Sequence, residues 1–192
     1  MALEIEAKMR IADLTRVADA LKLAGATPVT EHHETNIFFD TPESSLLAGG
    51  KGLRLRIDRE PANGRTTRII TFKGPRQSGP LKTREETEVI VDSEPSAIAL
   101  LQCLGYRRVL TFEKIRRSWK LGDCKVELDE LPLIGTFVEI EGPGDAEVMR
   151  VREQLGLSGT AIEMSSYASM LVRYLKANGI ASREVRFEKA AT

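Results

Sequence analysis

The chain has 192 residues, of which 42% are hydrophobic and 29% charged, as in ordinary globular domains with a sizeable core. Lys plus Arg and Asp plus Glu number 28 each, so the formal net charge is zero and gives no overall attraction to nucleic acid or to an anionic membrane. Cys103 and Cys124 lie in no metal-ligand spacing, and the N-terminus lacks a basic-then-apolar signal pattern. We therefore expect a cytoplasmic protein with no nucleic-acid or membrane partner.

Hydrophobic periodicity divides the chain into strand-like and helix-like runs. The helical runs carry apolar stripes and end at or near a glycine, which suits the conformation that follows a helix. The strand-like runs are separated in many places by links rich in Gly and Pro. In chain order we predict a strand at 3–9, a helix at 13–25, strands at 34–40, 53–59, 67–73 and 83–91, a helix at 95–106, strands at 110–121, 124–130 and 136–142, and helices at 144–156 and 165–179.

Eight strands, several of them joined by short hairpin-like links, favour an antiparallel sheet that closes or nearly closes into a barrel. The predicted fold class is α+β: an eight-stranded antiparallel β-barrel with helices packed on the outside. Residues 1–180 are expected to form a single domain, and the polar segment 181–192 is expected to be a loose C-terminal tail.

Charged residues within these strands fall on one parity, which places them on one face of each strand. In the opening run EIEAK, Glu4, Glu6 and Lys8 share a face, and Ile5 and Ala7 share the other. Further strands repeat the alternation, with the charged sets Arg54 and Arg56; Arg84, Glu86 and Glu88; Lys114 and Arg116; Glu127 and Asp129; and Glu139 and Glu141.

Two interpretations of the charged face stay open. Taken one strand at a time, such a face is usually solvated, and a plain β-sandwich would present its charges in this way. Against this, like charges are grouped on separate strands: Glu-x-Glu recurs, and Arg-x-Arg and Lys-x-Arg occur elsewhere. Neighbouring like charges repel unless a partner is supplied, and a solubilising surface mixes its signs. The grouping favours a charged face that lines the inside of a barrel.

A charged lumen of this kind has a definite chemistry. Carboxylate oxygens on some strands suit Mg²⁺ or Mn²⁺, and such an ion removes the repulsion between the glutamates. Arg and Lys on other strands suit the oxygens of several linked phosphates. Metal on one wall and cationic side chains on the other describe a polyphosphate site.

The residues at this point resemble a known family. EIEAK resembles the ExExK signature of the CYTH superfamily, also called triphosphate tunnel metalloenzymes, which includes CyaB-type class IV adenylate cyclases and thiamine triphosphatases. The likeness covers nearly the whole chain in order. It runs through HETNIFFDTP, KGLRLRID, ITFKGP, TREETEV, FEKIRRSW, VELDELPLIGTFVEIEG and SSYASML. A lone ExExK is a weak signal, and the ordered series makes it a strong one.

The resemblance implies roles for individual residues. It implies a divalent cation, Mg²⁺ or Mn²⁺, bound by the carboxylates Glu4, Glu6, Asp129, Glu139 and Glu141. It implies a catalytic triphosphate cradle made of the basic residues Lys8, Arg54, Arg56, Lys73, Lys114 and Arg116. Arg84, Glu86 and Glu88 complete the expected substrate-binding set, with Arg84 either reaching phosphate or pairing with Glu86. The SSY segment resembles a helix that closes one mouth of the tunnel.

Three functions follow as hypotheses. The first is a metal-dependent triphosphatase that hydrolyses an inorganic or organic triphosphate, because water as nucleophile needs no pocket for an organic group. The second is a CyaB-type adenylate cyclase that converts ATP to cyclic AMP and pyrophosphate. The third is a non-catalytic barrel that binds polyphosphate or RNA. The expected partner is a small triphosphate such as tripolyphosphate, ATP or thiamine triphosphate, and a homodimer is left open.

Overall fold

The computed structural model describes residues 2–188, which contain nine strands and five helices. The strands are β1 Ala2–Arg10, β2 Thr27–Asp40, β3 Gly52–Arg59, β4 Thr66–Lys73, β5 Lys82–Ile90, β6 Arg107–Leu121, β7 Cys124–Leu131, β8 Gly135–Glu141 and β9 Glu184–Val185. The helices are α1 Leu14–Leu23, α2 Ser45–Ala48, α3 Glu94–Cys103, α4 Asp145–Gln154 and α5 Tyr167–Ala177.

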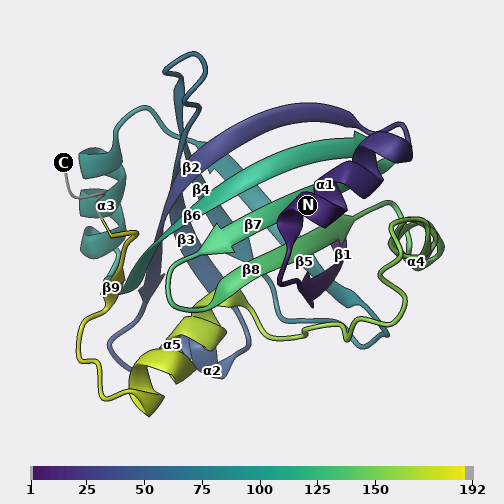
Figure 1. The fold of residues 1–192 in the computed structure, drawn as a ribbon. Helices are drawn as coiled ribbons and strands as arrows, with labels where there is room; N and C mark the ends of the chain where they lie inside the picture. Colours follow the sequence, from purple (N-terminus) through teal and green to yellow (C-terminus); the bar gives the residue numbers. More distant parts are fainter. Residues whose placement is uncertain (1, 189–192) are drawn as a thin grey trace.

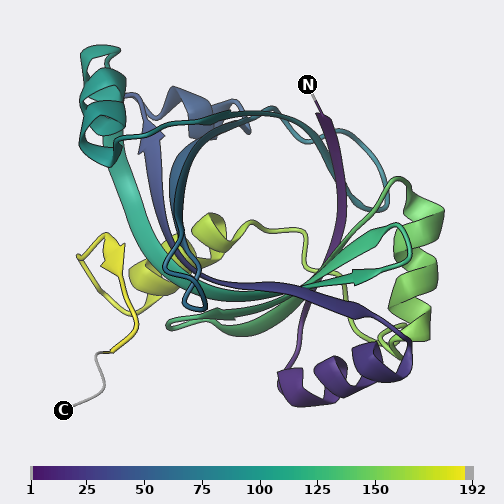
Figure 2. The same cartoon turned by 90° about the horizontal axis from the view of Figure 1, so that it is seen from above.

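The first eight strands form a closed antiparallel barrel, as predicted. Their order is β2-β3-β4-β5-β1-β8-β7-β6, and β6 pairs with β2 to complete the ring. The ring is evident in the view along its axis (Figure 2), whereas Figure 1 shows the strands from the side. The N-terminal strand β1 lies between β5 and β8, so it joins strands that are distant in the sequence.

Apolar residues of the opposite parity to the charged set cover the outside of the barrel. On β1, β7 and β8 they pack against α1 and α4, with Val17, Leu21 and Val148 in the shared core. On β2 and β3 they pack against α3 through Ile98 and Leu101. The outer shell therefore forms the main hydrophobic cores, and the charged parity is left to face inward.

Helix α5 differs from the other helices because it packs on inward-facing residues. Its apolar stripe contacts Leu110 and Phe112 of β6, which line the same cavity as the charged residues of that strand. In Figure 2 the helix lies across one end of the ring. The SSY segment thus lies at one mouth of the barrel and lines the cavity there, where the resemblance places it.

Several boundaries differ from the prediction. Strand β2 begins at Thr27 and not at residue 34, because its first half pairs with the end of β6 from Thr27 with Lys120 onward. Strand β6 begins at Arg107, and the short helix α2 was not anticipated.

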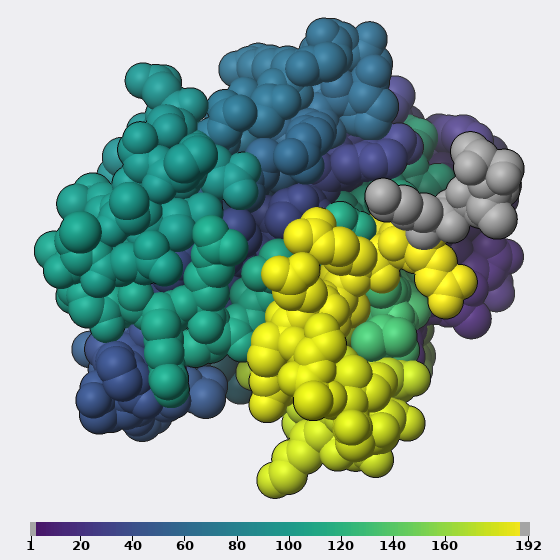
Figure 3. Space-filling model, turned by 90° about the vertical axis from the view of Figure 1, so that its left-hand side faces the viewer, coloured from purple at the N-terminus to yellow at the C-terminus, as the bar shows by residue number. Residues whose placement is uncertain are grey.

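The expected C-terminal tail is partly ordered on the barrel. Strand β9 pairs in parallel with Thr111 and Phe112 of β6, and Val185 is 3% exposed. Figure 3 shows this last segment, in yellow, packed against that side of the molecule. The backbone N–H of Phe187 donates to Glu113 at 3.0 Å. The end of the predicted tail, 189–192, lies outside the described residues.

No helix within residues 2–188 is long and apolar enough to cross a membrane.

Candidate functional site

A cavity of about 1190 Å³ occupies the barrel lumen. Every residue of the predicted site lines it except Asp129, which is fully buried and hydrogen-bonded to Arg116. The predicted residues on the lining are Glu4, Glu6, Lys8, Arg54, Arg56, Lys73, Arg84, Glu86, Glu88, Lys114, Arg116, Glu139 and Glu141. The alternation of charge along the strands therefore brings the predicted set together in one space.

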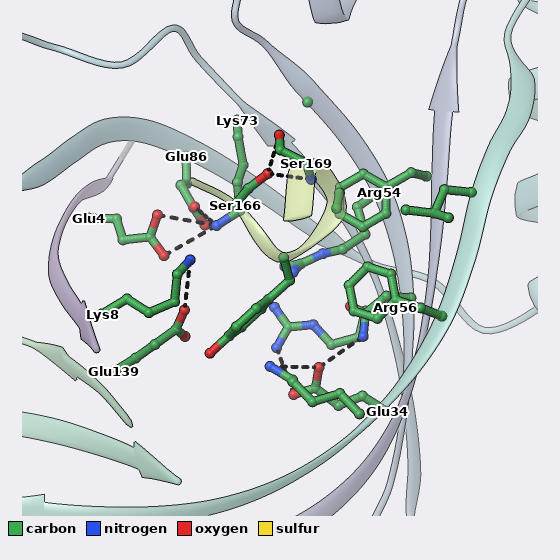
Figure 4. Close-up of a pocket in the computed structure, with 18 of the residues that line it drawn as sticks. Glu4, Lys8, Glu34, Arg54, Arg56, Lys73, Glu86, Glu139, Ser166 and Ser169 are labelled. Atoms are coloured by element: carbon green, nitrogen blue, oxygen red, sulfur yellow. Dashed lines mark hydrogen bonds and ion pairs between the residues drawn. The ribbon is translucent and has the colours of Figure 1, made fainter. Parts of the chain in front are cut away.

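Basic and acidic side chains face one another across this lumen. In the closed order of eight strands, β3 and β8 are four places apart, so Arg54 and Arg56 lie opposite Glu139 and Glu141. Figure 4 shows Arg54 and Arg56 on one side of the pocket and Glu4, Lys8 and Glu139 on the other. This opposition is the arrangement that a phosphate chain bridged to a cation needs.

Arg54 keeps much of its donor capacity for a ligand. Its Nη2 donates to Thr71 Oγ1 at 3.2 Å, and its buried Nε has no hydrogen-bond partner. Burial, together with the neighbouring charge of Arg56, lowers the pKa of Arg54 to about 10. A buried guanidinium with an unpaired donor is costly on its own, and a phosphate oxygen would satisfy it.

Arg116 is held far more tightly than Arg54. Its Nε and Nη2 donate to the two oxygens of Asp129 at 2.6 and 2.5 Å, and Nη2 also contacts Glu139. Glu127 lies 3.8 Å from Nη1. Burial alone would lower the pKa of Arg116, but these carboxylates raise it well above its ordinary value. Arg116 therefore organises one wall of the lumen.

The opposite wall carries a group of carboxylates near one another. Glu6 pairs in register with Glu141, and Glu4 is two residues away on the same face of β1. Burial raises the pKa of Glu141, and the charges of Glu4 and Glu6 raise it further. Burial also raises the pKa of Glu4, with a contribution from its hydrogen bond to Glu86. Like charges are thus concentrated here in a low-dielectric space.

Two lysines offset part of that charge. Lys73 Nζ lies 3.2 Å from both oxygens of Glu4 and also contacts Glu86. Lys82 contacts Glu6 and is 7% exposed. Arg84 forms no ion pair with Glu86, so of the two expectations for Arg84 the pairing with Glu86 is not found.

The five carboxylates predicted to bind metal fall into two groups. Asp129 and Glu139 contact Arg116, whereas Glu4, Glu6 and Glu141 lie together at the β1–β8 pairing. Among residues 2–188, no three Asp, Glu, His or Cys side chains are arranged to hold a metal ion together. The second group nevertheless has the right donors, since hard carboxylate oxygens crowded by like charge are the ligands that Mg²⁺ and Mn²⁺ take.

Tyr167 joins α5 to the ionic network of the lumen. Ser166 caps the helix by accepting a hydrogen bond from the backbone N–H of Ser169 at 3.2 Å, which places Tyr167 in the first turn. The phenol donates to Asp129 Oδ2 at 2.8 Å. Lys8 Nζ lies 4.3 Å from the centroid of the ring, so the ring also stabilises a buried cation.

Sequence reasoning missed several lumen residues, and three of them are central to the ionic network. Glu34 is 2% exposed and contacts three basic groups, Lys82 pairs with Glu6, and Tyr167 binds Asp129. The parity rule could have found the first two, because Glu34 shares a face with Asn36, and Lys82 shares one with Arg84. For Tyr167 no strand pattern exists, since its role depends on where α5 packs.

Comparisons with known proteins agree with this architecture. The family model described as CYTH domain matches residues 2–160. Adenylate cyclase CyaB of Aeromonas hydrophila is 32% identical over 185 residues, which cover 91% of this chain and 92% of that protein.

Solved structures give the same result for the fold. A Pyrococcus horikoshii protein superposes with a TM-score of 0.77 at 26% identity, covering 88% of this chain and 98% of that one. A Hippeastrum protein, an adenylyl cyclase candidate described as having a dominant triphosphatase activity, superposes with a TM-score of 0.67 at 21% identity, covering 88% and 95%. With the family model matching most of its length, the chain belongs to the CYTH family.

Proposed function

We propose that this protein is a divalent-metal-dependent enzyme that hydrolyses a linear triphosphate bound in the barrel lumen. The observation that carries the proposal is the opposition of Arg54 and Arg56 to Glu139 and Glu141 within one cavity. A uniformly basic lumen would bind phosphate, but only the acidic wall explains how the same cavity also attracts a cation.

The basic residues of the lumen position the substrate. Arg54 and Arg56 supply guanidinium donors to the phosphate oxygens, and Lys73, which contacts Glu4 and Glu86, adds a point charge to the same lumen. These groups also stabilise the negative charge that develops on the leaving oxygen as the bond to the terminal phosphorus breaks. The attacking water forms the new P–O bond, and its proton passes to a carboxylate of the lumen.

The acidic wall is the proposed metal site. Glu4, Glu6 and Glu141 would hold Mg²⁺ or Mn²⁺, and Glu139 would join them if it leaves Arg116. Asp129 would act indirectly, because both of its oxygens bind Arg116. When bound, the ion would neutralise phosphate oxygens and acidify a coordinated water. Until then Glu4 and Glu6 are balanced by Lys73 and Lys82.

Adenylate cyclase activity is the second candidate. The apolar side chains of Phe38, Leu47 and Val109 also line the cavity, and Phe38 stacks on Phe112 with ring centroids 5.7 Å apart. This surface suits an organic group such as a nucleobase. The 32% identity to CyaB supports the same reading of the site. Here the 3′-hydroxyl of ATP would attack the α-phosphorus and release pyrophosphate.

Product analysis separates the candidates. The protein is incubated with Mg²⁺ or Mn²⁺ and with tripolyphosphate, ATP or thiamine triphosphate. Release of orthophosphate supports hydrolysis, whereas cyclic AMP with pyrophosphate from ATP replaces it with the cyclase. Binding without turnover of any of the three substrates would assign the chain to a non-catalytic polyphosphate-binding or RNA-binding role.

Glu4→Gln tests the acidic wall directly. We expect turnover to fall by roughly 10²–10³-fold, the range for loss of one electrostatic group in an active site. The matched control is Glu85→Gln, because Glu85 pairs in register with the neighbouring Leu3 but is exposed on the outside of the barrel. Thermal melting should show that both variants fold, and Mn²⁺ with tripolyphosphate should stabilise only the control.

A further inference from the structure

Glu34 is a buried carboxylate at the centre of the cationic wall. Its oxygens lie 3.1 Å from Lys114 Nζ, 3.6 Å from Arg56 Nη1 and 3.7 Å from Arg116 Nε, and Asn36 Nδ2 donates to it at 3.1 Å. Figure 4 shows it beside Arg56, across the pocket from Glu4. Burial would raise the pKa of Glu34, but the three cations hold that pKa well below its ordinary value, so the carboxylate is charged at neutral pH.

Each of the three cations has a second carboxylate partner, although Glu34 is the nearest carboxylate to Lys114 and to Arg56. Arg116 is fixed by two hydrogen bonds to Asp129, and Lys114 lies 3.6 Å from the same residue. Arg56 lies 3.9 Å from both Asp58 and Glu88. Removing the charge of Glu34 therefore leaves the cationic wall largely in place.

What Glu34 adds is a fixed negative charge a few ångströms from any anion that these cations bind. We infer that Glu34 sets the anion affinity of the lumen, weakening the binding of a triphosphate and of its phosphate products so that the products can leave. The inference rests on the proposed function for the identity of the anion. The effect of Glu34 on anion affinity depends only on its charge and on the neighbouring cations, and does not require that the protein be an enzyme.

The expected size follows from Coulomb's law. At an effective dielectric constant of about 20, one unit charge about 6–12 Å away changes affinity on the order of tenfold to a hundredfold. Because substrate and product share the same phosphate chemistry, both feel this repulsion, and the tighter variant should retain product.

Glu34→Gln provides the test, with pyrophosphate as the probe. We expect isothermal titration without metal to show binding at least about tenfold tighter than in the wild type. In steady-state assays KM and kcat should both fall, with a burst of product in the first turnover. The control is Glu31→Gln on the same strand, whose exposed side chain pairs only with His33 on the outside. Unchanged or weaker pyrophosphate binding by Glu34→Gln overturns the inference.

Two further variants keep the inference testable if Glu34→Gln does not fold. Glu34→Asp retains the charge and should bind pyrophosphate within about threefold of the wild type. Glu34→Ala removes the same charge without placing an amide among the cations, so it should again bind pyrophosphate at least about tenfold more tightly, and binding no tighter than in the wild type would contradict us. If pyrophosphate binding responds as expected while no triphosphate is turned over, the inference stands and the proposed function fails.

Discussion

Arg54 and Arg116 face the same lumen but differ in how their charges are balanced. Arg116 contacts several carboxylates from β2, β7 and β8, whereas Arg54 makes one side-chain hydrogen bond, to Thr71. An ion pair that is satisfied within the protein stabilises the folded state only as long as both partners remain. A buried cation without such a partner lowers the stability of the folded state, and binding an anionic ligand recovers part of that free energy.

Substitution by Gln should therefore reduce mainly the stability of the protein at Arg116 and mainly its affinity for phosphate at Arg54. Arg116→Gln should lower the free energy of unfolding by about 3–5 kcal/mol, because it leaves buried Asp129 without its main partner. Arg54→Gln should change that free energy by less than about 1 kcal/mol and weaken pyrophosphate binding by roughly tenfold or more. Urea denaturation and calorimetric titration of both variants measure the two quantities. Equal loss of stability in both would contradict the distinction.

Glu34 also gives a pH dependence with a definite sign. Its pKa in the folded protein is well below that in the unfolded chain, so between these values the unfolded state binds more protons. Its stabilising contribution is therefore complete above a pH of about 4.5 and is lost as the pH falls through the folded-state pKa.

The unfolding free energy of the wild type should accordingly drop between pH 5 and pH 3 more steeply than that of Glu34→Gln. Urea titrations at several pH values measure the two slopes. Glu31→Gln, on the outer face of β2, should follow the wild type. Parallel curves for the wild type and Glu34→Gln would show that this carboxylate does not contribute.

At the scale of elements, α5 is the connection between the apolar core and the ionic lumen. One face of the helix packs on β6 through Leu171 and Leu175, and its first residue binds Asp129. The helix follows the region matched by the family model, which ends at residue 160. Its packing therefore determines how Asp129, and through it Arg116, is held.

Removing the phenol group tests this connection. Tyr167→Phe should lower the free energy of unfolding by about 1–3 kcal/mol, because buried Asp129 loses a donor. The matched control is Tyr174→Phe on the same helix, which should lie within about 0.5 kcal/mol of the wild type. Chemical denaturation gives both values. If the two variants are equally stable, the hydrogen bond is not important for the fold.

The elements also show what the sequence can and cannot predict. The alternation EIEAK, LRLR and VEIE has a period of two, so it fixes which side chains share a face, and the barrel and most of its lining follow from it. The first half of β2 has no such alternation. Pro28 and the adjacent His32 and His33 are not typical of a strand, although this segment pairs with β6. The length of β2 depends on its pairing with β6, which is distant in the sequence, and a local sequence pattern carries no information about that pairing.

The site was predictable to a similar degree and for the same reason. Grouped charges such as Arg54 and Arg56 stand out, whereas the isolated Glu34 does not, although it contacts three basic side chains. Some of the carboxylates contact Arg116 and others gather where β1 pairs with β8, and this division depends on distances across the lumen. Strand parity carries no information about those distances.

At the scale of the whole molecule, the position of β1 between β5 and β8 determines when this strand can pair during synthesis. This strand is synthesised before its partners β5 and β8, which end at Ile90 and Glu141. At a translation rate of about 5–20 residues per second, β1 waits roughly 7–26 s for β8 to emerge. Unpaired strand edges invite aggregation, and charged side chains suppress it. The charges of Glu4, Glu6 and Lys8 should therefore make the nascent strand less prone to pair with other chains until its neighbours exist.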